Sequence, residues 1–491
     1  MKRRTLLTAM AAAFASSVTG CAVGPDFLRP EVEVPVDWRI ALPQAESYAN
    51  LRWWEAFGDP ALNRLVETAL NENLDLQVAA ARVERYLGQL STTRSQFFPQ
   101  VGYGLDVSRN RATEVGVTPM PAGTDPWYKL YQGSISASWQ IDLFGRVRRQ
   151  SEAAQARVFS SEQGRRGTII SVVASVAGGY VTLRALDRKL EIARATAANY
   201  AETLRIFELR FKGGVVSQTE VASIESQYQQ AKAAVPLLEQ QVAAQENLLS
   251  VLLGRVPGPI ERGLALDALK VPQIPPGLPA SLLERRPDVL QAEQNLVAAN
   301  AEVGVAKSLY FPSISLTGAL GSTSAALSNF LSGPAAVAMI AAQVAGPIFT
   351  FGNIEGQVRS AEAAKSEAVA NYRLAVLEAL RDTNDALTGT EKLATSLEAQ
   401  VARVKALRDY ARLSRLKYDS GVSSYTDVLY AENELFSAEL NAVGSESDRL
   451  IQLVAVYRAL GGGWVDAVDA VDAVDGQALS LSVSAEKAAA E

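Results

Sequence analysis

A lone cysteine carries the clearest covalent chemistry of this sequence. Val18-Thr19-Gly20-Cys21 places small residues before a cysteine, which is the pattern of a lipobox with the cysteine as lipid acceptor. Three basic residues, Lys2 to Arg4, precede a short apolar run at 5–15 that is too short to span a bilayer. We expect residues 1–20 to be a signal peptide and Cys21 to carry a covalent lipid. The alternative is a secretory peptide that is cut at another bond.

The composition argues against most other chemistry. The 491 residues include no histidine and one cysteine, which excludes histidine-based acid–base catalysis, zinc or copper sites built on imidazole, and structural disulfides. The sequence also lacks a Walker A motif, a dinucleotide fingerprint, a G-x-S-x-G elbow and HExxH. Loss of residues 1–20 changes the net charge from −6 to −6 − 3 = −9, which argues against nucleic-acid binding. We expect no enzyme activity, no metal and no cofactor besides the lipid on Cys21.

The chain contains two copies of one large module. Landmark residues recur 207 residues later: Phe144-Gly145 at Phe351-Gly352, Phe211 at Tyr418, Gly214 at Gly421, and Leu253-Gly254 at Leu460-Gly461. Upstream the offset between the copies is 213, as for Asp75 and Asp288. This difference in offset fits a longer loop in the first copy between Pro99 and Phe144. A repeat of this length is not a short solenoid unit.

The repeat and the proline-rich segments divide the chain into six parts. They are the signal peptide (1–20), an N-terminal extension (21–61), the first copy (62–254), a linker (255–287), the second copy (288–461) and an acidic low-complexity tail (462–491). The tail repeats Val-Asp-Ala over 465–475. Its aspartates could bind calcium, but no glycine-turned loop or bidentate glutamate accompanies them, so a solvated tail is favoured.

The hydrophobic period predicts the same elements in each copy. It is helical over 62–90 and alternates with period two at 101–107 and 135–141, which predicts a strand hairpin over about 99–143. A helix of about 65 residues, roughly 100 Å long, follows from Arg146 to Phe211. It breaks at Gly213-Gly214, and a second helix runs from Ser217 to about Leu253. The second copy repeats this plan, with a strand hairpin over about 312–350.

An uncharged stretch of 47 residues, 308–354, could be a transmembrane helix. Glycines and prolines cut it into apolar runs shorter than the roughly 18 residues that a helical span needs. Strands of about ten residues, the length of a barrel span, fit better. Two hairpins give four strands, which cannot close a barrel, and an open sheet edge in hydrocarbon leaves backbone groups unpaired. If these strands enter a membrane, several chains must share one barrel.

Motifs in a fixed order resemble one family. They are Cys21 to Phe27 with Pro30, Trp53-Trp54 with Phe57 and Asp59-Pro60, Arg210 to Ser217, Arg285 to Asp288, Lys417 to Tyr425, and Leu460 to Trp464. Over about residues 15–464 the chain resembles the lipoprotein (NodT) branch of the TolC-like outer-membrane factors.

The resemblance implies a mainly α fold with a membrane β-barrel part. The family forms a homotrimer with a 12-stranded barrel in the outer membrane, continuous with a 12-helix periplasmic tunnel. It implies a passive exit duct of a tripartite efflux pump, lipid-anchored in the cell outer membrane, that exports drugs or other small toxic compounds. The implied partners are the other chains of the trimer, a periplasmic adaptor protein, an inner-membrane pump of the RND type and outer-membrane lipid.

The same resemblance places the helix turns at a periplasmic tip that stays shut until the adaptor engages. The residues assigned to the tip and to adaptor contact are Phe211, Gly213, Gly214, Val215, Val216 and Ser217 in the first copy, and Tyr418, Gly421, Val422 and Ser424 in the second. Both turn glycines are expected to take a positive φ. The apolar tip residues fit docking of partner helices, or they only seal the hairpin ends.

Glu220, Asp427 and Tyr430 are the candidate gate residues. In one interpretation the carboxylates form an acidic constriction. In the other they only cap the helices that start at Ser217 and Ser424, at a spacing close to that of a capping box. Tyr430 stands where relatives often have an aspartate, which favours closure by packing and hydroxyl bonding over charge repulsion.

Two other kinds of protein share some of these features. A lipid-anchored structural stalk without transport has long helices, but it has no use for the uncharged stretch at 308–354. A periplasmic adaptor has one helical hairpin flanked by β-rich segments rather than a tandem duplication with two strand hairpins. The residues therefore favour the duct.

Overall fold

The computed structural model describes residues 22–32, 52–113, 123–271 and 285–462 of the chain. The signal peptide, the lipidation site Cys21 and the acidic tail lie outside these ranges. The chain divides into two compact units: unit 1 comprises Met1–Glu31, Arg82–Ser161 and Gln291–Tyr372, and unit 2 comprises Val32–Ala81, Glu162–Leu290 and Arg373–Glu491. Each unit takes segments from both copies of the repeat.

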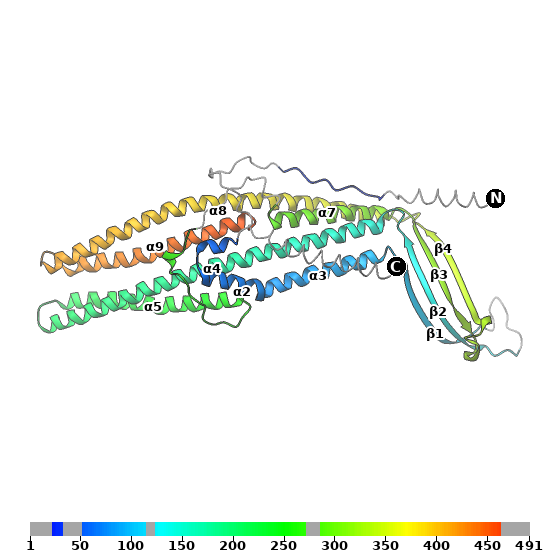
Figure 1. The fold of residues 1–491 in the computed structure, drawn as a ribbon, viewed down its shortest axis with the longest axis horizontal. Coiled ribbons are helices and arrows are strands. Elements are labelled where there is room, and N and C mark those ends of the chain that lie inside the picture. The colour runs from blue at the N-terminus through cyan, green and yellow to red at the C-terminus, as the bar shows by residue number, and fades with distance from the viewer. Residues whose placement is uncertain (1–21, 33–51, 114–122, 272–284, 463–491) are drawn as a thin grey trace. The chain divides into compact units, whose positions relative to one another are not determined.

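The elements of the two copies follow the same order (Figure 1). The first copy has α2 (Pro60–Glu72), α3 (Leu74–Ser95), β1 (Gln100–Arg111), β2 (Trp127–Ile141), α4 (Arg146–Lys212) and α5 (Gln218–Leu252). The second has α7 (Pro287–Ser308), β3 (Ser313–Ser324), β4 (Ala336–Ala345), α8 (Asn353–Asp419) and α9 (Tyr425–Ala459). The starts of α3 and α7 differ by 213 residues, and those of α4 and α8 by 207. The tandem duplication is confirmed.

Unit 1 contains a four-stranded antiparallel sheet in the order β1-β2-β3-β4. Residues paired across strands share a face, so the register separates an apolar face from a polar one. The apolar face includes Val101, Tyr103, Leu105, Val107, Ile135, Trp139, Leu316, Leu320, Ile340 and Val344. The other face is mainly polar on β1 to β3, where it includes Asp106, Ser108, Gln132, Ser134, Ser136, Ser138, Ser315, Thr317 and Thr323, whereas on β4 it carries Val337, Met339 and Ala341 beside Gln343.

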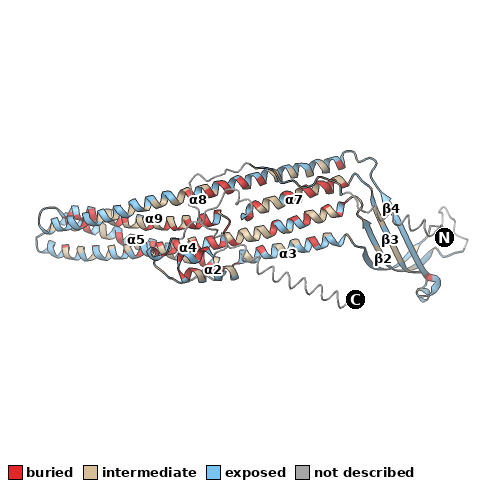
Figure 2. Ribbon diagram, turned by 45° about the horizontal axis from the view of Figure 1, so that its top comes forward, coloured by how far each residue is buried: buried red, intermediate tan, exposed pale blue. Residues whose placement is uncertain are grey.

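Two strands of this sheet occupy the uncharged stretch that could have been a transmembrane helix. Strands β3 and β4 lie within 308–354, so the strand prediction is confirmed and the helical alternative is wrong. Figure 2 shows β1, β2 and β4 mostly in the exposed colour and β3 mostly in the intermediate colour, whereas buried residues concentrate on the helices. An apolar face with so little cover is typical of a wall that faces lipid.

Residues 22–31 of unit 1 lie against the start of α4 and the middle of α7. Val23 N–H donates to Phe144 O over 3.3 Å, and the Arg149 guanidinium donates to the Asp26 carboxylate over 3.0 Å. Gly24 has a φ of 112°, and a Cβ there would lie 2.4 Å from the Gly304 Cα. The residues that follow Cys21 are therefore fixed beside the junction of β2 and α4.

The core of unit 2 forms around the apolar centre of α4. Its most deeply buried side chains include Trp54, Phe57, Leu62, Val176, Tyr180, Leu183, Leu249 and Leu253. Within the described residues, α4 is the one helix long and apolar enough to cross a membrane. Most of its apolar stretch is buried, and its side chains from Ile169 to Ala185 pack in this core, as expected for a core helix.

A buried carboxylate joins the N-terminal extension to this core. Asp59 caps α2 by accepting from Ala61 N–H over 2.8 Å, and it also accepts from the Tyr180 hydroxyl over 2.7 Å and from Leu264 N–H over 2.9 Å. Burial, together with this bond to Asp59, raises the pKa of Tyr180. Three satisfied bonds offset the cost of burying the charge.

Two elements differ from the sequence expectation. The continuous helix expected over 62–90 is divided at Asn73, whose side chain accepts from Leu76 N–H over 3.1 Å and donates to Leu252 O over 2.8 Å. The N-terminal extension, for which the sequence analysis predicted no helix, contains a short 3-10 helix, η1 (Trp53–Phe57), and Trp53 stacks on Tyr457 with centroids 5.1 Å apart. Both features depend on partners far away in the sequence.

Candidate functional site: the hairpin tips of unit 2

Both helix turns have the same backbone. Gly214 and Gly421 have φ values of 72° and 71°, as predicted. In the first turn, Val215 N–H donates to Arg210 O and Gly214 N–H to Phe211 O, each over 2.9 Å. The equivalent bonds of the second turn, from Val422 to Lys417 and from Gly421 to Tyr418, are also 2.9 Å long. This is the Schellman arrangement, in which a side chain at the glycine position is disfavoured.

One valine at each tip is exposed. Val215 is 74% exposed and Val422 is 76% exposed. Val216 is half-buried and packs against the cluster of apolar residues below the turns. The two exposed valines are therefore available to a partner, whereas Val216 seals the hairpin.

Three aromatic rings join the two hairpins below the turns. Phe207 lies 4.4 Å from Tyr425 and 6.1 Å from Tyr418, and the two tyrosine rings are 4.9 Å apart, all measured between centroids. Phe207 and Tyr425 are almost fully buried. The rings come from α4, α8 and α9, so the cluster packs the end of the first copy's long helix against both helices of the second.

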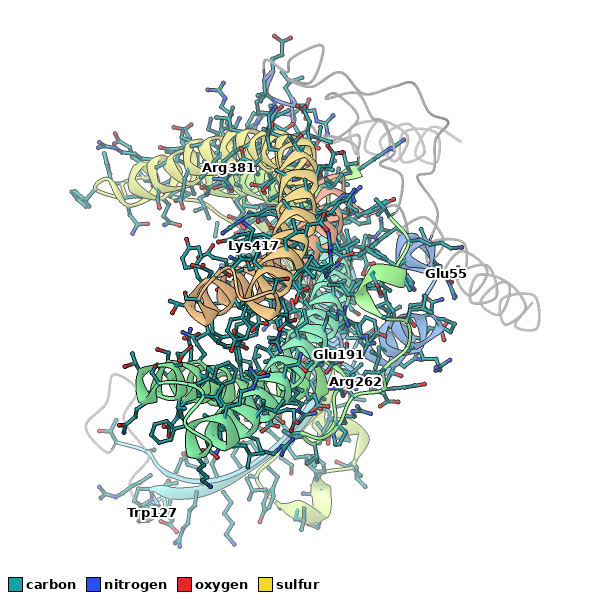
Figure 3. All side chains as sticks on the ribbon, turned by 90° about the vertical axis from the view of Figure 1, so that its left-hand side faces the viewer. Glu55, Trp127, Glu191, Arg262, Arg381 and Lys417 are labelled. Carbon is teal, nitrogen blue, oxygen red and sulfur yellow. The ribbon has the colours of Figure 1, made fainter. Side chains whose placement is uncertain are left out.

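Two arginines connect to the hydroxyl groups of this cluster. Arg210 donates to the Tyr418 hydroxyl over 3.2 Å, and Arg415 donates to the Tyr425 hydroxyl over 3.1 Å. The Arg210 guanidinium also lies 5.6 Å from the Phe207 ring centroid, a cation–π geometry. Lys417, the residue before Tyr418, is labelled on α8 in Figure 3. The tandem repeat did not predict this cluster, because the residue of the second copy that is equivalent to Phe207 is Ser414.

The two tip carboxylates differ in what they contact. Glu220 accepts from Ser217 N–H over 2.8 Å, and its own N–H donates to the Ser217 hydroxyl over 3.2 Å, which completes a capping box. Ser424 is the N-cap of α9, but its side chain makes no capping bond. Asp427 is exposed, and within the described residues its carboxylate has no hydrogen-bond partner. Tyr430 is 62% exposed.

A partly buried acid lies one to two turns further along α9. Burial raises the pKa of Glu432, and the charge of Arg415 opposes this shift. Its surroundings include Tyr425 and Tyr200, whose phenols have raised pKa values, chiefly through burial. The Tyr200 hydroxyl is buried, and no described group bonds to it. The sequence singled out neither residue.

Comparisons with known proteins identify this architecture. The sequence model described as Outer membrane efflux protein matches residues 65–255 and 278–462. The chain belongs to the outer membrane efflux protein family.

Individual relatives agree along nearly the whole chain. The toluene efflux pump outer membrane protein TtgC of Pseudomonas putida is 34% identical over 459 residues, which cover 91% of this chain and 93% of that protein. The probable outer membrane lipoprotein SilC of Salmonella typhimurium is 30% identical, with 91% of this chain and 97% of that protein covered. The open state of the MtrE outer membrane channel of Neisseria gonorrhoeae superposes with a TM-score of 0.82 and 30% identity, covering 90% of this chain and 99% of that one.

These findings confirm the predicted family and fold class. The protein is an outer-membrane component of the efflux-channel type, and its fold is the tandem-duplicated, mainly helical TolC-like fold with a strand region. The roles of the tip residues, of the gate candidates and of Cys21 stay predictions.

Proposed function

We propose that this protein is the passive exit duct of a tripartite efflux pump. Three chains would contribute their four-stranded sheets to one 12-stranded barrel, and their long helices to a 12-helix tunnel. The observation that carries this proposal is the sheet of unit 1, which has one apolar face, an opposite face that is mainly polar on β1 to β3, and two outer strands, β1 and β4, that pair on one side only within the described chain.

The open edges require further chains. Backbone groups at a sheet edge have no water to bond in hydrocarbon, so a membrane sheet must close on itself. Four strands are too few, because the smallest membrane barrels have about eight. Pairing of β1 of one chain with β4 of the next satisfies both edges and places the polar face around a water-filled lumen.

The lipid on Cys21 would anchor the chain at the same membrane. The lipobox supports this modification, and so does the likeness to the lipoprotein SilC. Residues 22–26 are fixed beside the end of β2, so a lipid on the preceding residue would enter the membrane next to the barrel. Labelled fatty acid should enter the wild type and not Cys21→Ser, and labelling of that variant would refute lipidation at Cys21.

The hairpin tips would close the duct and receive the adaptor. Exposed Val215 and Val422 give apolar contacts for adaptor helices. Asp427 and Tyr430, both exposed on α9, are the proposed gate residues, whereas Glu220 is already engaged in a capping box. The proposed partners are a periplasmic adaptor and an inner-membrane RND-type pump, which would supply the energy. We propose no enzymatic activity for the duct itself.

The proposed cargo is small toxic compounds, including drugs. The name of the relative TtgC mentions toluene, which supports apolar aromatic molecules as one candidate class. The adaptor and the pump would select among them.

Crosslinking tests the docking of the tips. A photo-crosslinking residue would replace Val215 or Val422, and Val256, which is 85% exposed and lies away from the turns, would be the matched control position. With the cognate adaptor and pump co-expressed, we expect adaptor crosslinks from positions 215 and 422 and none from 256. Equal crosslinking from all three positions would contradict the proposal. Efflux without any adaptor would contradict gating.

A further inference from the structure

The apolar face of the sheet ends in basic residues at one end of β1 and β2. Arg109 pairs with Lys129, and Arg111 pairs with Trp127. Directly paired residues share a face, and steps of two from Val107 keep Arg109 and Arg111 on the apolar face. Along the described strands these three cations are the only charged residues on that face, and all three are exposed.

This end of the strands lies away from the helices of unit 1. Strand β1 starts at Gln100, shortly after α3 ends, and β2 ends at Ile141, shortly before α4 begins. The basic residues lie at the opposite ends of both strands. Under the proposed function, on which this inference rests, the helices are periplasmic, so the basic end reaches the outer leaflet of the membrane.

The cations lie next to a ring typical of a membrane interface. The Arg109 guanidinium is 5.1 Å from the ring centroid of Trp127, which is labelled in Figure 3. Neither Arg109 nor Lys129 has a carboxylate partner in the described part of the chain. The nearby Asp125 accepts from Trp127 N–H over 3.0 Å, and Asp106 is on the polar face. Among the described strand residues, positive charge therefore predominates on this face.

Apolar surface continues directly below the cations. A Cβ at Gly133 would lie 2.7 Å from Cζ of Phe330 and 2.9 Å from Cδ2 of Leu105. Phe330 belongs to the loop at 325–335, so this loop bends over the same apolar face. The loop contains no charge, and its Leu327 and Leu331 are 66% and 92% exposed. Such side chains are suited to acyl chains rather than to water.

We propose that Arg109 and Lys129 bind the phosphate groups of an outer-leaflet lipid, with its acyl chains along the apolar face and the loop at 325–335. Guanidinium groups bind phosphate oxygens through paired hydrogen bonds, and a tryptophan at this height is typical of the headgroup region. A phosphorylated lipid fits better than an acidic protein, because the cations are continuous with an apolar band instead of with a polar rim. The site would hold lipid A on the outside of each barrel segment.

Native mass spectrometry of the full-length protein in detergent tests this site. We expect wild type to bind diphosphoryl lipid A, and Arg109→Gln with Lys129→Gln to lower the affinity by at least about tenfold. The matched control, Lys232→Gln with Lys405→Gln, removes two exposed charges from helices; Lys232 also lies over an aromatic ring, at 5.6 Å from the Tyr228 centroid. It should bind like wild type. Each variant must keep the oligomeric mass of wild type.

The outcomes separate this site from the proposed function. Equal lipid A binding by the Arg109/Lys129 variant and wild type would overturn the proposal, as would equal binding of dephosphorylated lipid A. Displacement of the lipid by millimolar inorganic phosphate would assign the site to a free anion and also overturn it. Protein that binds lipid A in this selective way but supports no efflux would leave the site standing and refute the duct.

Discussion

The tip between α4 and α5 and the tip between α8 and α9 have the same turn and different side chains. Their glycine φ values, 72° and 71°, and their backbone bonds are nearly identical. In the first tip, Glu220 closes a capping box with Ser217; in the second, the Ser424 hydroxyl makes no capping bond, and Asp427 is exposed. The two copies share the backbone of the turn, whereas their carboxylates have different surroundings. The first tip therefore stabilises its helix through a capping box, whereas the second leaves its carboxylate exposed.

Loss of the turn geometry should have the largest effect. Gly214→Val or Gly421→Val puts a β-branched residue at a positive φ, at a cost of about 1–2 kcal/mol or more per site. We expect each variant to reach the outer membrane with the oligomeric mass of wild type and to lose efflux, measured as accumulation of a fluorescent substrate in cells. Gly356→Val, at a helical position with open space around it, is the control and should export normally. Normal export by both tip variants would show that the turn geometry is dispensable.

The charge of the second tip should matter more to conduction than that of the first. Asp427→Asn removes an exposed carboxylate, so the preference of the channel for cations over anions should fall by roughly a factor of a few. Glu220→Gln should change it little, because a glutamine can still complete the capping box. Reversal potentials in planar bilayers under a salt gradient measure the ion preference of both variants. An equal change in the two variants would remove the distinction between the tips.

The sequence predicted the backbone of this site well and its side-chain contacts poorly. Glycines at 214 and 421 and the break in helical period predicted both turns, because positive φ is a local property of the chain. The cluster of Phe207, Tyr418 and Tyr425 was not predicted, since its rings come from helices of both copies. The capping box at Ser217 is present and the equivalent one at Ser424 is absent, although the serine and the carboxylate are three residues apart in both copies.

The same distinction holds for the fold. The helix limits of α4 and α8 were predicted to within about two residues, because proline and glycine end helical patterns locally. The division at Asn73 was missed, since it depends on a bond to the distant Leu252. The strand register, which places Arg109 opposite Lys129, was also beyond the sequence, because loop length and tertiary packing set it.

A capping comparison should give a moderate effect. Ser217→Ala removes the acceptor for Glu220 N–H and should cost about 1 kcal/mol of local stability in the first turn of α5. Ser424→Ala should cost close to nothing, because that hydroxyl makes no capping bond. Hydrogen exchange of the amides at 218–222 and at 425–429 measures the two local opening free energies. Equal losses would mean that Ser424 caps α9 after all.

The smallest expected effect is a pH dependence of the local stability of α9 around Glu432, below the tips. The pKa of Glu432 is raised in the folded state, so the folded state binds more protons, and this stabilisation is fully present below the unfolded pKa of about 4.3. It is lost as pH rises through the higher folded pKa. Hydrogen exchange around 425–432 should therefore speed up as pH rises through this window, after correction for intrinsic exchange. Glu432→Gln should abolish the pH dependence; its persistence in that variant would assign it to another group.

The subunit count of the extracted protein tests the central claim most directly. Native mass spectrometry of the full-length chain, taken from the outer membrane in mild detergent, should give a mass of three chains, each close to 52.5 kDa before processing, with the β-sheet signal retained in circular dichroism. That result would follow from four strands per chain closing one shared barrel. A stable monomer that keeps the same β-sheet signal would contradict the account, because its two sheet edges would be satisfied without a partner.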